Sequence, residues 1–379
     1  MHITSRPVST GSAFLAMFFL GIGVAIVGAT ARAAGLAAGE IGYLIATQNV
    51  GFGVSVVISG ALADRFRKAP ILAIGLVMLG VSFATLYRSD SFAANLLVML
   101  LMGAGMGVAE AVTDAWLLEM YTRHESRLVT INHLAVSVGS VAITLYLMAM
   151  ELDWRVSLSR VAVLLGALAV LVAFLRPVAR ASRAGSDRGV FRQLSTDPGM
   201  ILLALAAMGT VGIEVGIAGV ITTFAVELRG VDAEAAQLLL ALYLIGLALG
   251  RVVVGVVGGR GRPGRMVVMA AGLALLCSTL LFIVPLSVGL LPVPLFVLGL
   301  AAGPLLPLTI TAAGLRYRHV AGTAMGMVKF AIPVGGIVIP GLVGLLSDAT
   351  SFALALGVFP IAALLVLLSA LTSERLARR

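Results

Sequence analysis

SGALADRFRK, residues Ser59 to Lys68, is a short charged stretch between two long apolar segments. Each flanking segment is long enough to cross the hydrocarbon core of a bilayer, which takes about 20 mainly apolar residues. A charged run this short between two such segments predicts a tight hairpin between membrane-spanning helices. The hairpin contains Arg65, Arg67 and Lys68. Because basic loops collect on the cytoplasmic side of membranes, we expect the hairpin to be cytoplasmic.

The composition of the whole chain supports a membrane protein. Of 379 residues, 60% are hydrophobic and 11% are charged, whereas about 25% are charged in an ordinary soluble domain. The 44 glycines suit helices that pack closely in lipid. We attribute the net charge of +9 to basic loops that meet anionic headgroups, and we expect no nucleic-acid partner. The single cysteine, Cys277, excludes an internal disulfide and a cysteine metal cluster.

Apolar segments of spanning length recur along the chain and predict an all-α protein with twelve transmembrane helices. The segment at 290–314 contains four prolines, so we expect it to be the least straight. The predicted spans are 13–34, 41–63, 70–87, 92–120, 128–150, 156–175, 198–225, 234–257, 266–285, 290–314, 321–346 and 351–371.

Positive charge predicts the orientation of these spans. With twelve spans, nineteen of the 26 Lys and Arg residues fall on one side of the membrane, and that side is the cytoplasm by the positive-inside rule. Both termini are then cytoplasmic. The first apolar segment has no small-residue cleavage site after it, so we interpret it as a retained helix. The preference for Arg over Lys and the abundance of Ala and Gly suggest a bacterial source, and hence the inner membrane.

The chain divides into two similar halves. A polar, arginine-rich stretch at 176–197 predicts a cytoplasmic linker between six-helix bundles at 1–175 and 198–379. An internal repeat supports this division. Shifts of 195 and 196 residues superpose a colinear set of glycines: Gly51 on Gly246, Gly60 on Gly255, Gly103 on Gly299, Gly107 on Gly303 and Gly139 on Gly335.

The fourth predicted helix carries the strongest functional signal. Gly103, Gly107, Glu110 and Asp114 recur at i, i+4, i+7 and i+11, which is one face of an α-helix. An ionisable residue inside a span costs roughly 2.5–3.5 kcal/mol to insert, so such residues face protein or a water-filled cavity. We expect both acids to contribute to substrate binding or proton coupling. The alternative is an ion pair with a basic residue of another span that only holds the halves together.

The basic residues inside predicted spans are His133, Arg251 and Lys329. His133 and Lys329 correspond under the repeat shift, and Lys329 needs a partner, either the acids of helix 4 or an anionic substrate. For His133 the alternative is a packing role with a hydrogen bond. Arg251 lies near the cytoplasmic end of the eighth predicted span, 234–257. We expect it to form a gate salt bridge or to extend its charged end toward the membrane surface, and substrate contact is the alternative.

Three neutral hydrogen-bonding residues lie near the middle of predicted spans: Gln48 and Asn49 in helix 2, and Tyr243 in helix 8. Sugars and polyols are bound by several such groups together with an acid. The alternative is hydrogen bonding between helices, worth about 1 kcal/mol each. The sequence leaves both options open.

The hairpin resembles the signature of the major facilitator superfamily, G-x-L-A-D-R-x-G-R-K. Gly60, Leu62, Asp64 and Arg65 match in place, and Arg67 stands where the signature has its second glycine. The resemblance implies two six-helix bundles that enclose a midplane cavity and transport solute by alternating access. It also implies that Asp64 latches the cytoplasmic side together with Gly60, Arg65 and Lys68.

A weaker resemblance covers about half of the chain. The order G-x-G-x-x-E-x-x-x-[ND] in helix 4, with Asn132 and Gly139 in helix 5, is similar to the fucose–proton symporter branch of that superfamily. It places Glu110 in a sugar cavity and puts Asp114 where the branch has asparagine. The stretch TVGIEVGIAGVITTF resembles helix 7 of the branch and places Glu214 in the cavity.

The chain departs from this branch in helix 1. The branch carries a proton-accepting aspartate there, but no acid occurs between Ser12 and Ala34. Coupling to protons would then depend on Glu110, Asp114 or Glu214, because a carboxyl group in a low-dielectric cavity can act as a reversible proton carrier. Facilitated diffusion without coupling stays open.

These observations favour a monomeric secondary transporter for a small polar organic solute, a sugar or sugar-like compound, with proton coupling as an option. Efflux of drugs or metabolites is the first alternative, and a solute receptor that does not transport is the second. The sequence contains no phosphate loop, no H-E-x-x-H and no paired C-x-x-C. We therefore expect no enzymatic activity, no cofactor and no metal site.

Overall fold

The computed structural model describes residues 6–121, 125–149, 153–175, 188–257 and 263–377. Helices make up nearly all of this described part, and twelve segments of it are long and apolar enough to cross a membrane. The predicted all-α fold with twelve spans is therefore confirmed. The first half of the chain contains six helices: α1 (Arg6–Thr30), α2 (Ala38–Arg65), α3 (Lys68–Thr85), α4 (Phe92–Met120), α5 (Glu125–Ala149) and α6 (Trp154–Ala173).

The second half of the chain has more helical elements than spans. They are α7 (Arg188–Ser195), α8 (Pro198–Arg229), α9 (Ala233–Val257), α10 (Pro263–Phe282), η2 (Val288–Leu290), α11 (Pro292–Ala302), α12 (Leu305–Arg316), η3 (Arg318–Val320), α13 (Ala321–Ala349), α14 (Phe352–Ala355) and α15 (Val358–Leu376). The tenth span is built from η2, α11 and α12, and the twelfth from α14 and α15. The proline-rich tenth span is thus broken where the sequence predicted the least regular helix.

Contacts within the chain define two compact units. Unit 1 comprises Met1–Gly35 and Ala46–Ala184, and unit 2 comprises Leu36–Ile45 and Gly185–Arg379. The first turns of α2 belong to unit 2 because they pack against α13: a methyl group on Gly42 would overlap the backbone of Gly344. The predicted division at 1–175, 176–197 and 198–379 stays a prediction.

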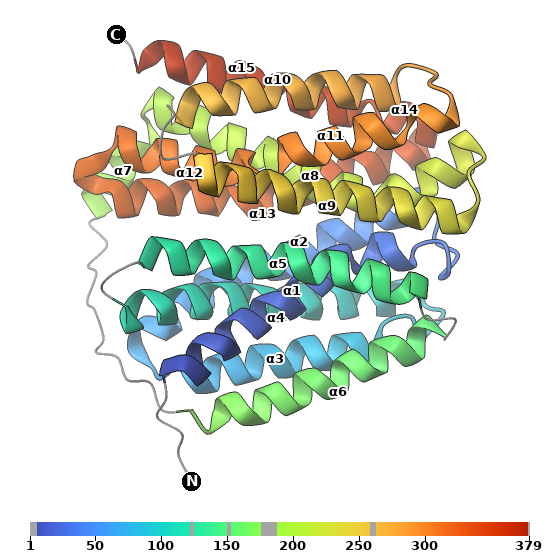
Figure 1. Cartoon of the computed structure of the whole chain (residues 1–379). Helices are drawn as coiled ribbons and strands as arrows, with labels where there is room; N and C mark the ends of the chain where they lie inside the picture. Colours follow the sequence, from blue (N-terminus) through green and yellow to red (C-terminus); the bar gives the residue numbers. More distant parts are fainter. Residues whose placement is uncertain (1–5, 122–124, 150–152, 176–187, 258–262, 378–379) are drawn as a thin grey trace. The chain divides into compact units, whose positions relative to one another are not determined.

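The same helix pairings recur in the two units (Figure 1). In unit 1, α1 packs against α5, and α3 packs against α4 and α6. In unit 2, α8 packs against α13 and α15, α9 against α11, and α10 against α15. The α1–α5 and α8–α13 pairs are equivalent under the sequence repeat, as are the α3–α6 and α10–α15 pairs.

Glycines at equivalent positions explain the sequence repeat. A methyl group on Gly103 of α4 would overlap the carbonyl oxygen of Gln48 in α2, and one on Gly299 of α11 would overlap that of Tyr243 in α9. A shift of 195 residues relates Gln48 to Tyr243. The repeat therefore marks places where two helix backbones touch, which only glycine permits.

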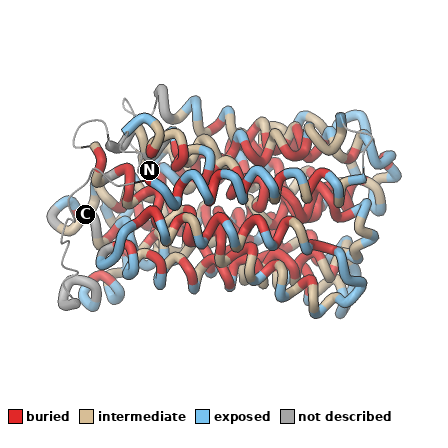
Figure 2. Tube along the Cα trace, turned by 90° about the horizontal axis from the view of Figure 1, so that it is seen from below, coloured by how far each residue is buried: buried red, intermediate tan, exposed pale blue. Residues whose placement is uncertain are grey.

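Apolar side chains cover much of the exposed surface of the helices. Val163, Met269 and Leu354 are 72%, 75% and 70% exposed. Figure 2 shows exposed residues recurring along helices that also carry many buried ones. In water such a surface would promote aggregation, whereas hydrocarbon solvates it.

Candidate functional site

Helix α4 presents its two acids on one face, as the spacing predicts. Asp114 is buried at 7% exposure, and Glu110 is half-buried one turn earlier. On the same face, a methyl group on Gly107 would overlap the carbonyl oxygen of Phe52, which belongs to α2. Helix α2 therefore packs against the face of α4 that carries the two acids. Because Asp114 is buried, protein groups rather than bulk water must supply most of the hydrogen bonds to its carboxylate oxygens.

Helix α5 supplies the partners of Asp114. The side-chain amide of Asn132, which is fully buried, donates through Nδ2 to Asp114 Oδ1 and to Thr113 Oγ1, each at 3.1 Å. His133 Nε2 lies 3.1 Å from Asp114 Oδ2. Each carboxylate oxygen of Asp114 therefore has its own partner, and these partners are neighbours in the sequence of one facing helix.

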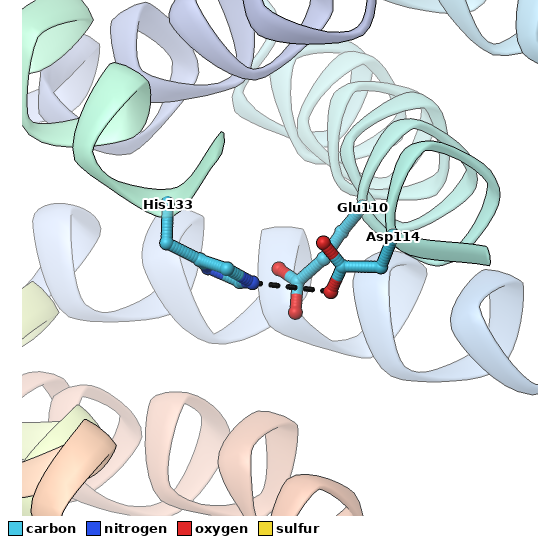
Figure 3. Close-up of side chains that lie close together, drawn as sticks. All are labelled: Glu110, Asp114 and His133. Atoms are coloured by element: carbon cyan, nitrogen blue, oxygen red, sulfur yellow. Dashed lines mark hydrogen bonds and ion pairs between the residues drawn. The ribbon is translucent and has the colours of Figure 1, made fainter. Parts of the chain in front are cut away.

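Glu110, Asp114 and His133 converge on one point (Figure 3). One ligand atom from each lies within 4.8 Å of the others, and Figure 3 shows both carboxylates beside the imidazole ring. We call Glu110, Asp114, Asn132 and His133 the α4–α5 cluster. His133 keeps a side-chain exposure of 35%, whereas that of Asp114 is 10%.

The chemistry of the cluster is that of proton binding and hydrogen bonding to a solute. Two carboxylates this close repel each other unless a proton or a cation lies between them. Imidazole is the side chain whose charge changes near neutral pH. Carboxylate and imidazole groups are also ligands for divalent metal ions, so the same three groups could hold such an ion. Asn132 fixes Asp114 in either case.

Unit 2 contains a further ionic group, which joins two residues whose predicted roles are separate. Arg251 of α9 donates through Nη2 to Glu214 Oε1 of α8, and through Nε to the carbonyl oxygen of Gly303 at 3.2 Å. The side chains of Arg251 and Glu214 are 17% and 13% exposed. Glu214, predicted in a solute cavity, is thus the ion-pair partner of the predicted gate residue.

Gln48 and Tyr243 make equivalent hydrogen bonds between helices. Gln48 Nε2 donates to the carbonyl oxygen of Gly23 at 2.9 Å, and the Tyr243 hydroxyl donates to that of Glu214 at 3.3 Å. Gln48 is 4% exposed and Tyr243 is 0% exposed. These contacts correspond to the interhelical alternative. Asn49 is also buried. Solute contact by Gln48, Asn49 and Tyr243 stays a prediction.

Lys329 lies half-buried on α13 of unit 2. Its predicted partners were the helix 4 acids or an anionic substrate, and this pairing stays a prediction. Its counterpart under the repeat, His133, belongs to the α4–α5 cluster.

Among the described side chains of the charged hairpin, Lys68 makes an ionic contact. Lys68, only 5% exposed, pairs with Glu119 at the end of α4 and donates to the carbonyl oxygen of Ala63 at 2.9 Å. Arg65 is exposed, and among the described residues no neighbouring atom lies within 4 Å of a methyl group placed on Gly60. The side chain of Asp64 lies outside the described residues. Glu119 is not among the predicted site residues, although an acid at the end of α4 beside a basic hairpin is a signal that the sequence contains.

A further polar contact, also missed, links the start of α8 to the end of α12. Asp197 caps α8 by accepting from Met200 N–H at 2.8 Å and accepts a hydrogen bond from the Tyr317 hydroxyl. Burial acts to raise the pKa of Asp197, but the hydrogen bonds from Tyr317 and Met200 and the charge of Arg316 bring that pKa below its ordinary value. Burial and the bond to Asp197 raise the pKa of Tyr317 to about 12.

Comparison with known proteins identifies the family. The model of the Major Facilitator Superfamily matches residues 8–287 and 211–378. The chain belongs to this superfamily, so the resemblance seen in the charged hairpin is confirmed. Among curated protein sequences, none matches the chain.

Solved structures of other transporters share the fold. An inward-facing bacterial homologue of the human lysosomal transporter Spinster has a TM-score of 0.76 at 15% identity, with 98% of each chain covered. The nucleoside transporter NupG, solved as a point mutant, has a TM-score of 0.76 at 13% identity, with 97% of this chain and 99% of that chain covered. A D-xylose–proton symporter has a TM-score of 0.74 at 15% identity, with 97% of both covered. At these identities the likeness shows the fold alone.

Proposed function

We propose that this protein is a secondary transporter that moves a small, hydroxyl-rich organic solute, a sugar or sugar-like compound. Transport occurs by alternating access and is coupled to the movement of a proton. The observation that supports this proposal most strongly is the α4–α5 cluster, in which buried Asp114 is held by Asn132 and His133 beside Glu110. The nucleoside and D-xylose transporters that share the fold move hydroxyl-bearing solutes, which agrees with the proposal.

The half-buried Glu110 is the proposed solute contact. Its carboxylate can accept hydrogen bonds from two adjacent hydroxyl groups, and charge-assisted bonds of this kind are about twice as strong as neutral ones. Asp114, by contrast, already has a partner on each oxygen. We therefore assign solute binding to Glu110 and assign to Asp114 a share in holding the proton.

The charge of the cluster is restored at the end of each transport cycle. A proton that enters from one side of the membrane binds at His133 Nε2 or at the carboxylates of Asp114 and Glu110, and its positive charge reduces the repulsion between the two acids. Solute binds to the protonated cluster. After the transporter changes its access, the solute and the proton leave on the other side, and the cluster regains its original charge. Asn132 keeps Asp114 in place throughout.

The remaining features of the proposal follow from charge and the family. We place the protein in a bacterial inner membrane with both termini in the cytoplasm, working as a monomer. The charged hairpin then lies on the cytoplasmic side, where the Lys68–Glu119 pair fixes the start of α3 against the end of α4. Asp64 and Arg65 are the proposed latch of that side, with Gly60 in the same segment.

Uptake into proteoliposomes tests this function. Purified protein would be assayed against a panel of sugars, nucleosides and organic acids, with and without an inward proton gradient. We expect one hydroxyl-rich solute to accumulate when the gradient is present. Glu110→Gln should lose most uptake of that solute, whereas Glu234→Gln, at an exposed position in the first turn of α9, should retain it.

The same assay can reject the proposal in favour of efflux. If no panel solute enters but amphipathic organic cations are expelled from the vesicles, the protein is an exporter. If a solute enters at equal rates with and without the gradient, and accumulates in neither case, facilitated diffusion replaces proton coupling.

A further inference from the structure

The helical hydrogen bonding of the tenth span is interrupted at Gly303 and Pro304, between α11 and α12, although both residues keep helical backbone dihedrals; we call this interruption the break. In a continuous α-helix the carbonyl oxygen of Gly303 would accept from the N–H of residue 307. Residue 307 is a proline, which has no N–H. Inside a membrane, water does not satisfy a carbonyl left in this way, so another donor must do so.

Arg251 is that donor. Its Nε lies 3.2 Å from the carbonyl oxygen of Gly303. The close approach depends on Gly303 itself, because a methyl group there would overlap the carbonyl oxygen of Leu247, one turn before Arg251 in α9. The remaining end of the same guanidinium binds the carboxylate of Glu214 in α8. One side chain therefore connects three elements of unit 2: α8, α9 and the break.

The charge of Glu214 holds Arg251 in this position. Of the elements packed against α8, α9 also contributes the Tyr243 hydroxyl, which binds the backbone carbonyl of Glu214. Helix α13 carries Lys329 in its first third and Asp348 at its end, and α11 carries no ionisable side chain. The charged groups of α12 and α15 lie in their last turns, and α7 carries two arginines: Arg316; Glu374 and Arg375; Arg188 and Arg192.

We propose that Glu214 and Arg251 form a proton-sensitive clamp on the break in the tenth span. While Glu214 is ionised, it anchors the guanidinium beside Gly303 and keeps α11 and α12 at a fixed angle. When Glu214 takes up a proton, the ion pair is lost while Arg251 keeps its charge. The break is then free to bend. The inference rests on the proposed alternating access, because a hinge in one span is useful only if that span moves.

The clamp can be tested without any solute. In a Cys277→Ala background, spin labels at Val293 of α11 and Leu315 of α12, which are 67% and 46% exposed, would report the distance across the break. Full-length protein in lipid nanodiscs would be measured by pulsed electron paramagnetic resonance between about pH 9 and about pH 3, a range that extends to both sides of the pKa of an ordinary glutamate, about 4.3. The proposal predicts that the distance distribution broadens or shifts as the pH falls.

Three substitutions separate the clamp from a general loss of structure. Glu214→Gln should show the low-pH distribution of the wild type at every pH, while Glu234→Gln keeps the normal response. Pro307→Ala gives Gly303 a backbone donor, so it should narrow the distribution of Glu214→Gln again when the two changes are combined. Arg251 acts as a positioning residue, because it holds the break through Gly303. Its role is measured by the pH dependence of the distance distribution.

Two results would overturn the clamp. One is a wild-type distance distribution that does not change with pH. The other is a Glu214→Gln protein that matches the wild type at high pH. Both are independent of whether a sugar is transported, so failure of the clamp and failure of the proposed function can be told apart.

Discussion

The fourth and tenth spans are equivalent under the internal repeat, yet they differ in what they can do. Both place glycines against a neighbouring backbone at matching positions, Gly103 and Gly299 in particular. Helix α4 is continuous from Phe92 to Met120 and carries two acids, whereas the tenth span is split into α11 and α12. Close backbone contact is thus the feature the two halves share, while ionisable groups and helix continuity differ between them.

This difference suggests a division of labour. In unit 1 the positions equivalent to Leu306 and Ile310 hold Glu110 and Asp114, and the rigid helix keeps them in line. In unit 2 the ionic group lies elsewhere, on α8 and α9, and contacts the break in the tenth span at Gly303. Under the two proposals above, one half would bind solute and the other would bend.

The largest expected effect comes from the shared glycine contacts. Gly103→Val and Gly299→Val should each destabilise the protein by more than about 3 kcal/mol, because the added side chain overlaps a backbone carbonyl that cannot move aside. Thermal unfolding in detergent checks this. Gly166→Val and Gly272→Val, at positions with no atoms within 4 Å of an added methyl group, are matched controls. Equal losses at all four positions would remove the basis of the comparison.

Breaking the ionic group of unit 2 should have the next largest effect. Arg251→Met leaves the half-buried carboxylate of Glu214 without its cation, which should cost about 2–3 kcal/mol, less than the roughly 3–5 kcal/mol of a fully buried pair. The double variant Glu214→Gln with Arg251→Met should recover much of that loss, since no charge is left unpaired. Unfolding temperatures of the single and double variants give the coupling between the two residues. Simple additivity would show that the pair is not an energetic unit.

The two equivalent hydrogen bonds should have small and similar effects. Gln48→Leu and Tyr243→Phe each remove one bond between helices, worth about 1 kcal/mol, and thermal unfolding would measure both losses. If solute affinity falls at least tenfold while stability is unchanged, these residues bind solute and the interhelical interpretation is wrong.

The smallest expected effect lies at the Asp197–Tyr317 contact. Tyr317→Phe should cost less than about 1 kcal/mol, because Asp197 is partly exposed. The lowered pKa of Asp197 means that its contribution is present above the ordinary aspartate value and fades as the pH falls below it. The raised pKa of Tyr317, about 12, makes its contribution fade between about pH 10 and about pH 12. The stability difference between wild type and Tyr317→Phe, followed against pH, should therefore be flat near neutrality and shrink at both extremes.

The sequence was sufficient for the spans, the repeat and the acidic face of α4, because each depends on a pattern within one segment. It noted Asn132 through the resemblance of helices 4 and 5 to a known branch, and His133 as an ionisable residue inside a span, but it did not place either residue beside Asp114. It did not pair Arg251 with Glu214. Both residues lie on helices that are apolar nearly all round, so the pattern of hydrophobicity does not say which faces meet.

Other features needed three-dimensional information for a similar reason. Lys68 and Glu119 are 51 residues apart, and their pairing depends on where α3 and α4 end. The start of α2 packs with unit 2 because glycines in α2 and α13 meet, and the hydroxyl of Tyr43 reaches Asp348 at 2.9 Å. Neither residue stands out in the sequence, since both lie at the ends of spans where polar residues are ordinary.

The central claim is that the α4–α5 cluster carries the coupling proton. The most direct test follows proton movement with a pH-sensitive dye when the solute found in the uptake panel is added to proteoliposomes. We predict that the wild type moves protons together with the solute, and that Asp114→Asn exchanges solute across the membrane without moving protons. If Asp114→Asn and Glu110→Gln both transport the solute with the wild-type proton ratio, the cluster does not couple transport to protons and the account is contradicted.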